Sequence, residues 1–369
     1  MKCTTIPLFV LFACADPLGA QPGNMPHGPG ALVGSSASSF HVDVQGSLWV
    51  WGSNSAGQLG VPDMRSQYLP VKGMDGVKAV AAGERHVLFL KGDGTLWAAG
   101  ANGEGQLGNG TTDDQPGPVE VAQGVVGLAA GQESSFYITA DHGLWAMGGN
   151  TFGQLGTGNT DRQLRPVKVM EDVRMVAAGA KHALFVKHDG SLWACGGNEG
   201  HQLGDGTTTA RPVPVKVADH VVQAACGNQY SLFLKDDGTL WGMGFNGGGQ
   251  LGDGSVYSVQ RPKQLLNGVK QMAAGHGHTL ILKQDGSLWA CGRNDFGQLG
   301  DGTNANALVP VNVLDGVAAV SAGLYHSLVL KGDGTVWSAG SNGSGQLGTG
   351  RGTSDRNVFM AVQFNQAGK

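Results

Sequence analysis

The chain has 369 residues, of which 64 are glycine, and a formal net charge of −4 from 24 basic and 28 acidic residues. It has no basic tail or basic run, so it lacks the electrostatic footprint of a nucleic-acid-binding protein, and we expect no nucleic-acid partner. The glycine content is far above the usual share and indicates many tight turns and close backbone approaches.

The N-terminus predicts a signal for export. Residues 1–20 hold Met1-Lys2 followed by a short apolar run at residues 6–13, a pattern typical of a compact secretory signal. Residues 21–30 are rich in glycine and proline and carry no Lys, Arg, Asp or Glu, which predicts a linker. No other stretch is long enough to span a membrane. We therefore expect an extracytoplasmic protein that is secreted, periplasmic or lipid-anchored.

The residues at the end of this apolar run are compatible with two ways of cleaving the predicted signal. Leu11 to Cys14 is similar to a bacterial lipobox, in which Cys14 would be lipidated after cleavage and would give a lipid anchor to the membrane. Phe12 fits that pattern poorly, and ordinary cleavage after Ala15 or Ala20 is the alternative. A disordered or mis-started N-terminus is the remaining interpretation.

From residue 31 onward one unit recurs with a period of 48 residues. A tryptophan marks each copy, namely Trp49, Trp97, Trp145, Trp193, Trp241, Trp289 and Trp337. Each copy also has Gly three residues later, Asn five residues later and Gln-Leu-Gly from nine to eleven residues later. A fixed period of this length indicates one supersecondary unit copied around an array. We expect the tryptophans to be structural and to fill the wedges between neighbouring units.

Within a copy the residues read as short strands. In the second copy, strands are predicted at residues 86–90, 95–99, 118–121 and 125–130, and Gly92-Asp93-Gly94 is a hairpin signal. No window shows a sustained helical period. Four strands in each of seven units predict an all-β fold, a seven-bladed β-propeller of four-stranded blades.

The two ends of the repeat region are complementary. Residues 31–34 resemble the fourth strand of a unit, whereas the last copy stops after Phe364 without such a strand. We therefore expect the N- and C-terminal strands to close one blade together, which would leave no open sheet edge. The predicted propeller domain spans residues 31–366.

The motif Trp-x-x-Gly-x-Asn-x-x-Gly-Gln-Leu-Gly, together with the preceding Ala-Ala-Gly-x-x-His, resembles the regulator-of-chromosome-condensation repeat over about residues 30–365. The resemblance implies a seven-bladed propeller. The family includes a nuclear Ran guanine-nucleotide exchange factor, the plant UV-B photoreceptor, ubiquitin-ligase subunits and the secreted bacterial β-lactamase-inhibitory protein II, to which this chain is similar in layout. Because one fold serves several functions here, the resemblance alone does not fix the function.

One repeat position suggests a ring of polar side chains. Eleven residues before each repeat tryptophan stand Ser38, His86, Ser134, His182, Tyr230, His278 and His326. Equivalent residues of different blades lie far apart around an axis, so we expect these side chains to bond the neighbouring blade rather than to hold a metal. No nucleophile or acid pair breaks the repeat, and we expect no catalytic residue, metal or cofactor.

Two loop sites vary freely between copies. One is the residue pair before the His position, and the other lies one to two residues past the repeat Asn. By resemblance, the first site carries partner-facing aromatic residues. The predicted partner-binding residues are Glu84, Arg85, Glu133, Phe152, Lys181, Gln229, Tyr230, His276, Phe296, Leu324 and Tyr325.

These patterns predict an exported, monomeric, non-catalytic scaffold that binds a protein partner through one face of the propeller. Two alternatives remain open: a guanine-nucleotide exchange factor or chromatin-binding regulator of the same family, and a propeller enzyme or glycan-binding domain. Exchange activity in the family is associated with an insertion that projects from a blade, and the unbroken 48-residue spacing leaves no room for one.

Overall fold

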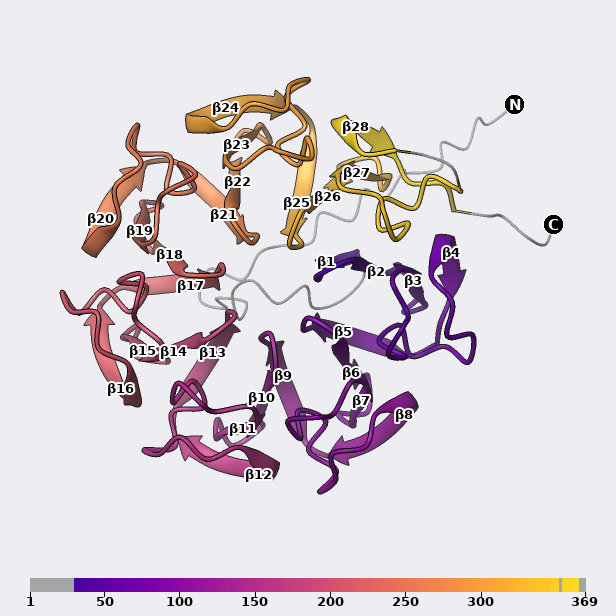
Figure 1. Cartoon of the computed structure of the whole chain (residues 1–369), viewed down its shortest axis with the longest axis vertical. Coiled ribbons are helices and arrows are strands. Elements are labelled where there is room, and N and C mark those ends of the chain that lie inside the picture. Colours follow the sequence, from indigo (N-terminus) through magenta and orange to yellow (C-terminus); the bar gives the residue numbers. More distant parts are fainter. Residues whose placement is uncertain (1–29, 352–353, 365–369) are drawn as a thin grey trace, which may run out of the picture.

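Seven antiparallel sheets stand around a central axis in a computed structural model that describes residues 30–351 and 354–364 (Figure 1). Each sheet has four strands, and these described ranges contain no helix. The predicted all-β, seven-bladed propeller is therefore confirmed. The predicted signal in residues 1–20, with Cys14, lies outside the described residues, as does the predicted linker except for Gly30.

The strands follow one another blade by blade. Blade 1 comprises β1 (Ala31–Gly34), β2 (Ser38–Val42), β3 (Leu48–Gly52) and β4 (Gln67–Lys72). Blade 2 comprises β5 (Val77–Ala82), β6 (His86–Lys91), β7 (Leu96–Gly100) and β8 (Gln115–Ala122). Blade 3 comprises β9 (Val125–Ala130), β10 (Ser134–Thr139), β11 (Leu144–Gly148) and β12 (Gln163–Met170). Blade 4 comprises β13 (Val173–Ala178), β14 (His182–Lys187), β15 (Leu192–Gly196) and β16 (Arg211–Ala218). Blade 5 comprises β17 (Val221–Cys226), β18 (Tyr230–Lys235), β19 (Leu240–Gly244) and β20 (Val259–Leu266). Blade 6 comprises β21 (Val269–Ala274), β22 (His278–Lys283), β23 (Leu288–Gly292) and β24 (Ala307–Leu314). Blade 7 comprises β25 (Val317–Ala322), β26 (His326–Lys331), β27 (Val336–Gly340) and β28 (Arg356–Ala361).

The local sequence explains how each blade forms. In blade 2, β6 is almost entirely buried, as its continuous apolar run requires, whereas the outer strand β8 is half exposed and carries the prolines that suit a sheet edge. The predicted hairpin joins β6 to β7. Asp93 Oδ1 accepts hydrogen bonds from the Thr95 backbone N–H at 2.9 Å and from the Thr95 hydroxyl at 2.7 Å. Gly94 has φ of +84°, a conformation that L side chains rarely adopt.

The division of the chain into blades differs from the prediction. The strand at residues 125–130 is the innermost strand of blade 3, not the fourth strand of blade 2, because each blade begins at the axis and ends at the rim. Every blade is therefore one continuous segment. The expectation that one blade combines strands from both chain ends is wrong. The N-terminal strand still closes the ring, since β1 packs against β25 and β26 of blade 7.

Apolar clusters fill the seven boundaries between neighbouring blades. The boundary between blades 7 and 1 is sealed by a tryptophan outside the repeat pattern. Trp51 is fully buried, and its Nε1 donates a hydrogen bond to the Gln346 carbonyl of blade 7 at 2.9 Å. Val362 joins the same cluster, and Phe364 packs edge-on against Trp51 with ring centroids 5.9 Å apart. The segment after β28 thus packs onto the first blade.

The seven repeat tryptophans pack against these clusters, but each is only partly buried. Trp97 shows the pattern: its Nε1 donates to Thr95 Oγ1 at 2.9 Å, and Lys91 Nζ lies 4.7 Å from the ring centroid. The indole therefore keeps its N–H and one ring face near solvent. Leucine and phenylalanine side chains such as Phe89 and Leu107 fill the fully buried wedge instead.

Candidate partner-binding face

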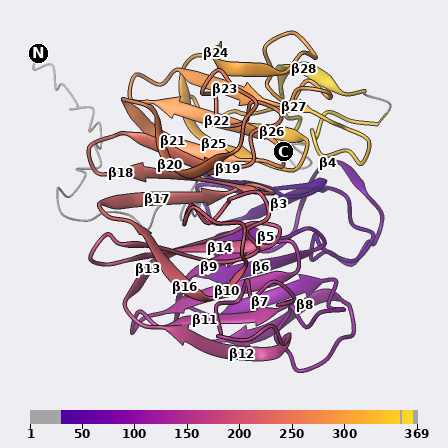
Figure 2. The same ribbon diagram turned by 60° about the vertical axis from the view of Figure 1, so that its left-hand side comes forward.

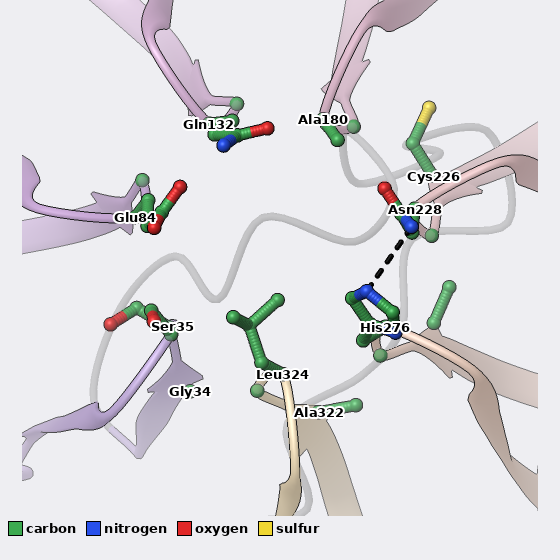
Figure 3. Close-up of a pocket in the computed structure, with 18 of the residues that line it drawn as sticks. Gly34, Ser35, Glu84, Gln132, Ala180, Cys226, Asn228, His276, Ala322 and Leu324 are labelled. Atoms are coloured by element: carbon green, nitrogen blue, oxygen red, sulfur yellow. Dashed lines mark hydrogen bonds between the residues drawn. The ribbon is translucent and has the colours of Figure 1, made fainter. Parts of the chain in front are cut away.

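The innermost strands end around a shared mouth at one end of the central axis. A cavity of about 410 Å³ opens there, and the first residue of each variable pair lines it (Figure 3). These seven residues are Ser36, Glu84, Gln132, Ala180, Asn228, His276 and Leu324. A second cavity of about 160 Å³ lies between the inner strands and is lined mainly by alanine and valine side chains. The residues at the mouth are polar and variable, whereas those around the second cavity are mostly apolar.

Glycine allows the blades to meet at this mouth. A Cβ on Gly83 would lie 2.4 Å from the Gly131 carbonyl oxygen of the next blade and 2.2 Å from a ring carbon of His86. Backbone hydrogen bonds cross the same boundaries, for example from Glu84 N to Gln132 O at 3.3 Å and from Leu324 N to Ser35 O at 3.0 Å. The repeated Ala-Ala-Gly therefore fixes the backbone and leaves the following pair to project.

The two variable loop sites, which are distant in sequence, meet across the boundaries between blades 3 and 4, blades 4 and 5, and blades 6 and 7. The second residue of a pair lies beside the loop that follows the repeat Asn in the preceding blade. Lys181 of blade 4 thus lies over Phe152 of blade 3, with Nζ 4.3 Å from the ring centroid. A Cβ on Gly200 would lie 3.1 Å from Gln229 Cβ in the same way. The face therefore carries a ring of cross-blade contacts outside its mouth.

Aromatic side chains gather on blades 6 and 7. Tyr325 stacks at a tilt on Phe296 across the boundary, with ring centroids 5.1 Å apart, and lies 5.3 Å from the ring of His276. His276 Nε2 lies 3.1 Å from Asn228 Nδ2, as Figure 3 shows. Leu324 projects into the mouth beside them. All of these side chains are half buried, so this half of the face is amphipathic and partly ordered before any partner binds.

Carboxylates gather on blades 2 and 3, which lie in the opposite half of the ring from blades 6 and 7 (Figure 2). Burial, and then the neighbouring carboxylates of Glu104 and Glu84, raise the pKa of Glu133 above its ordinary value. Arg162 Nη1 is 3.9 Å from Glu104, and Arg85 is exposed at the edge of the group. Three carboxylates thus repel one another at the surface, and a cation placed over them would relieve that repulsion.

One predicted partner-binding residue does not belong to this surface. Tyr230 is fully buried, and its hydroxyl donates a 2.6 Å hydrogen bond to the His278 carbonyl of blade 6. Its contact is with the neighbouring blade, which is the structural role expected for its repeat position. The prediction that Tyr230 faces a partner is wrong, because the side chain of this first residue of β18 points into the blade boundary.

The buried histidines form pairs with serines that superficially resemble a base and its nucleophile. His182 Nε2 lies 2.9 Å from Ser231 Oγ, and that hydroxyl donates to the Gln202 carbonyl at 2.7 Å. The hydroxyl proton is thus committed to a carbonyl, and the serine accepts from the imidazole. Burial lowers the pKa of His182 to about 4. Both side chains are inaccessible, so the pair joins blades and has no access to a substrate.

In residues 30–351 and 354–364, no group of three or more His, Cys, Asp or Glu side chains is arranged to hold a metal ion. The same ranges contain no helix of the length and apolarity needed to cross a membrane.

The repeat region matches a known protein family. The family model described as the RCC1-like domain matches residues 30–266 and, in a second overlapping match, residues 172–367. The chain belongs to the RCC1-like domain family. Among curated proteins, none matches it.

Several solved structures are similar to this chain. Prp20p from Saccharomyces cerevisiae, whose structure was described with its binding to Gsp1p and histones, has 24% identity and a TM-score of 0.79, covering 89% of this chain and 88% of that one. Yeast Prp20 bound to Kap60 has 22% identity and a TM-score of 0.80, covering 99% and 92%. Human WBSCR16 has 26% identity and a TM-score of 0.78, covering 86% and 94%. The yeast likenesses establish the fold alone.

Three further residues lie on the candidate partner-binding face and were not among the predicted partner-binding residues. Glu104 occupies the variable position past the repeat Asn and could have been included on that ground. Arg293 and Asp295 form an ion pair at 2.7 Å. The Arg293 side chain covers Gly277, where a Cβ would come within 2.8 Å of Arg293 Cδ. Its position, four residues past the repeat tryptophan, is a third variable site that holds Ser, Ala, Gly or Phe in other copies.

Proposed function

We propose that this protein is an exported, non-catalytic, monomeric scaffold that binds a protein partner through the face around the mouth. The observation that carries the proposal is the meeting of two variable loop sites across several blade boundaries. Positions that hold the blades together repeat with little change, whereas these positions differ from blade to blade without disturbing the fold. Variation on loops over a rigid scaffold is where recognition residues are found.

The chemistry of the face suits a protein better than a small substrate. The aromatic contacts on blades 6 and 7 resemble the anchors that dominate protein interfaces. The carboxylates on blades 2 and 3 would repel a phosphate backbone, and they suit a partner that presents Lys or Arg. We expect the partner to place an apolar surface over Phe296 and Tyr325 and a cation near Glu104 and Glu133.

The export part of the proposal rests on residues 1–20 and their apolar run. It predicts that the mature chain starts after residue 13, either at a lipidated Cys14 or after Ala15 or Ala20. N-terminal sequencing and mass spectrometry of the protein recovered from outside the cytoplasm distinguish these starts. Recovery of the intact chain from the cytoplasm alone would contradict export and leave the binding face untouched.

A triple substitution tests the binding face. Arg85→Ala, Phe296→Ala and Tyr325→Ala together should weaken partner binding by roughly tenfold or more, since a single interface anchor contributes about 2 kcal/mol. The melting temperature should change little, because these side chains are exposed or half buried.

The matched control is a triple substitution at the opposite end of the blades, Lys78→Ala, Glu171→Ala and Lys270→Ala, all of exposed residues. It should bind the partner as the wild type does. Equal binding by the first triple variant, or loss of binding in the control, would show that the partner does not use the face around the mouth.

A further inference from the structure

The end of the blades opposite the mouth has a pair of histidines that the repeat does not account for. His142 lies in the β10–β11 hairpin of blade 3, and His188 lies in the β14–β15 hairpin of blade 4. His188 Nε2 is 3.1 Å from His142 Nδ1, and the ring centroids are 4.3 Å apart. Both side chains are exposed. Two imidazole nitrogens from neighbouring blades thus meet at the surface.

Both ends of this contact depart from the repeat. His142 has φ of +63°, and at its position the other six blades have glycine, also at positive φ: Gly46, Gly94, Gly190, Gly238, Gly286 and Gly334. A side chain in this conformation costs about 1 kcal/mol or more. The position of His188 holds no histidine in any other copy.

The spacing of the two nitrogens fits a shared metal ion. Zinc–imidazole bonds are about 2.0–2.1 Å long, so two nitrogens on one ion lie about 2.9 Å apart at a right angle and about 3.4 Å apart at the tetrahedral angle. The observed 3.1 Å falls between these limits. Each ring has a second nitrogen that can carry its proton when the contact nitrogen binds a metal.

Two charged side chains act on His188 in opposite directions. Burial, and then the neighbouring His142, lower the pKa of His188; Asp172 raises it, and Arg174 lowers it. Asp172 is exposed, and its main-chain carbonyl accepts the His188 backbone N–H at 3.1 Å.

We propose that His142 Nδ1 and His188 Nε2 bind a divalent transition-metal ion, of the zinc, nickel or copper class that imidazole prefers, between blades 3 and 4. Water completes the coordination, because the described residues offer no third ligand group there. The site is independent of the proposed partner face, and its ion is exchangeable.

The test is a titration of the untagged full-length protein with Ni²⁺, and separately with Zn²⁺, followed by calorimetry. We expect His142→Gly to lose one equivalent of bound ion or to bind it at least tenfold more weakly, and His188→Gln to do the same. His142→Gly installs the residue that the other blades have, so it should fold and melt at least as high as the wild type without metal. Mg²⁺ should not bind at this site.

The control is His201→Gly, another exchange of a positive-φ histidine for the repeat glycine. His201 has φ of +67° and its Nδ1 contacts the Thr207 carbonyl at 3.0 Å. This variant should bind the metal as the wild type does. In the wild type, bound Cu²⁺ should show coupling to two nitrogens by electron paramagnetic resonance, and His142→Gly should lose it. Equal metal binding by wild type and His142→Gly would overturn the proposal.

Discussion

The side chain eleven residues before each repeat tryptophan determines how two blades are joined. A histidine occurs there where the next blade offers a serine hydroxyl, as in His86 with Ser135 at 2.8 Å and His278 with Ser327 at 3.1 Å. Tyr230 occurs where the next blade offers Thr279. The sequence reveals this pairing of side chains only when the residue in one copy is compared with the residue that faces it in the following copy. Without that comparison, Tyr230 is predicted to be a partner-binding residue.

Ser231→Ala tests the contribution of one such pair. The substitution leaves the buried His182 Nε2–H without a partner, which should lower the free energy of unfolding by about 1–3 kcal/mol. The double variant His182→Ser and Ser231→Ala recreates the Ser134 and Ala183 combination of blades 3 and 4, and it should recover part of that loss. Urea unfolding measures both values. If Ser231→Ala has the same free energy of unfolding as the wild type, the hydrogen bond between His182 and Ser231 does not stabilise the boundary between blades 4 and 5.

The buried histidines also predict how stability depends on pH. Burial lowers the pKa of His86, His182 and His326 from 6.5 to about 4, and that of His278 to about 3. Their Nδ1 atoms have no hydrogen-bond partner among the described residues, so an added proton would be buried and unsatisfied. The unfolded chain takes up protons below pH 6.5 and the folded chain does not until about pH 4.

The contribution of these histidines to the free energy of unfolding should therefore be fully present above pH 6.5, and it should decrease as the pH falls toward 4. The melting temperature measured by circular dichroism across this window checks the prediction, and the variant His182→Ser with Ser231→Ala should show a shallower decline. A melting temperature that stays constant from pH 7 to 4.5 is the contrary outcome.

At the scale of strands and turns, the sequence predicts most of what is found. The strands at residues 86–90 and 95–99 and the turn at Gly92-Asp93-Gly94 are confirmed within about one residue, because short apolar runs and turn chemistry are local properties of the sequence. The grouping of strands into blades is not local. The strand at residues 125–130 follows blade 2 in the chain but pairs with β10, and nothing within its own sequence distinguishes the two choices.

Trp51 predicts where the ring is weakest. The cluster between blades 7 and 1 has fewer buried apolar members than the other six in the part of the chain described by the structure, and Trp51 is its largest side chain. Trp51→Ala should lower the free energy of unfolding by about 3–5 kcal/mol. The half-buried Trp193→Ala should cost less, which corrects the expectation of a fully buried wedge. Guanidinium denaturation compares the two, and a larger loss for Trp193→Ala would contradict this account of closure.

At the scale of the whole molecule, the two ends of the blades have different chemistry. The mouth end carries the cross-blade contacts of the two variable loop sites, and the opposite end carries the hairpins. The sequence predicted which loops vary, since variation is visible against a strict repeat. It could not predict that the pair residue of one blade meets the loop of the preceding blade, as Phe296 and Tyr325 do, because that contact depends on the rotation between blades.

The most direct test of the proposed function is hydrogen exchange of the protein with and without its captured partner, read by mass spectrometry. The account predicts that binding slows exchange in the loops around the mouth, at residues 83–85, 131–133, 179–181 and 323–325. Exchange at the hairpins of the opposite end, such as residues 92–94, should stay unchanged. Protection confined to the hairpins, with the mouth loops unaffected, would contradict the assignment of the binding face.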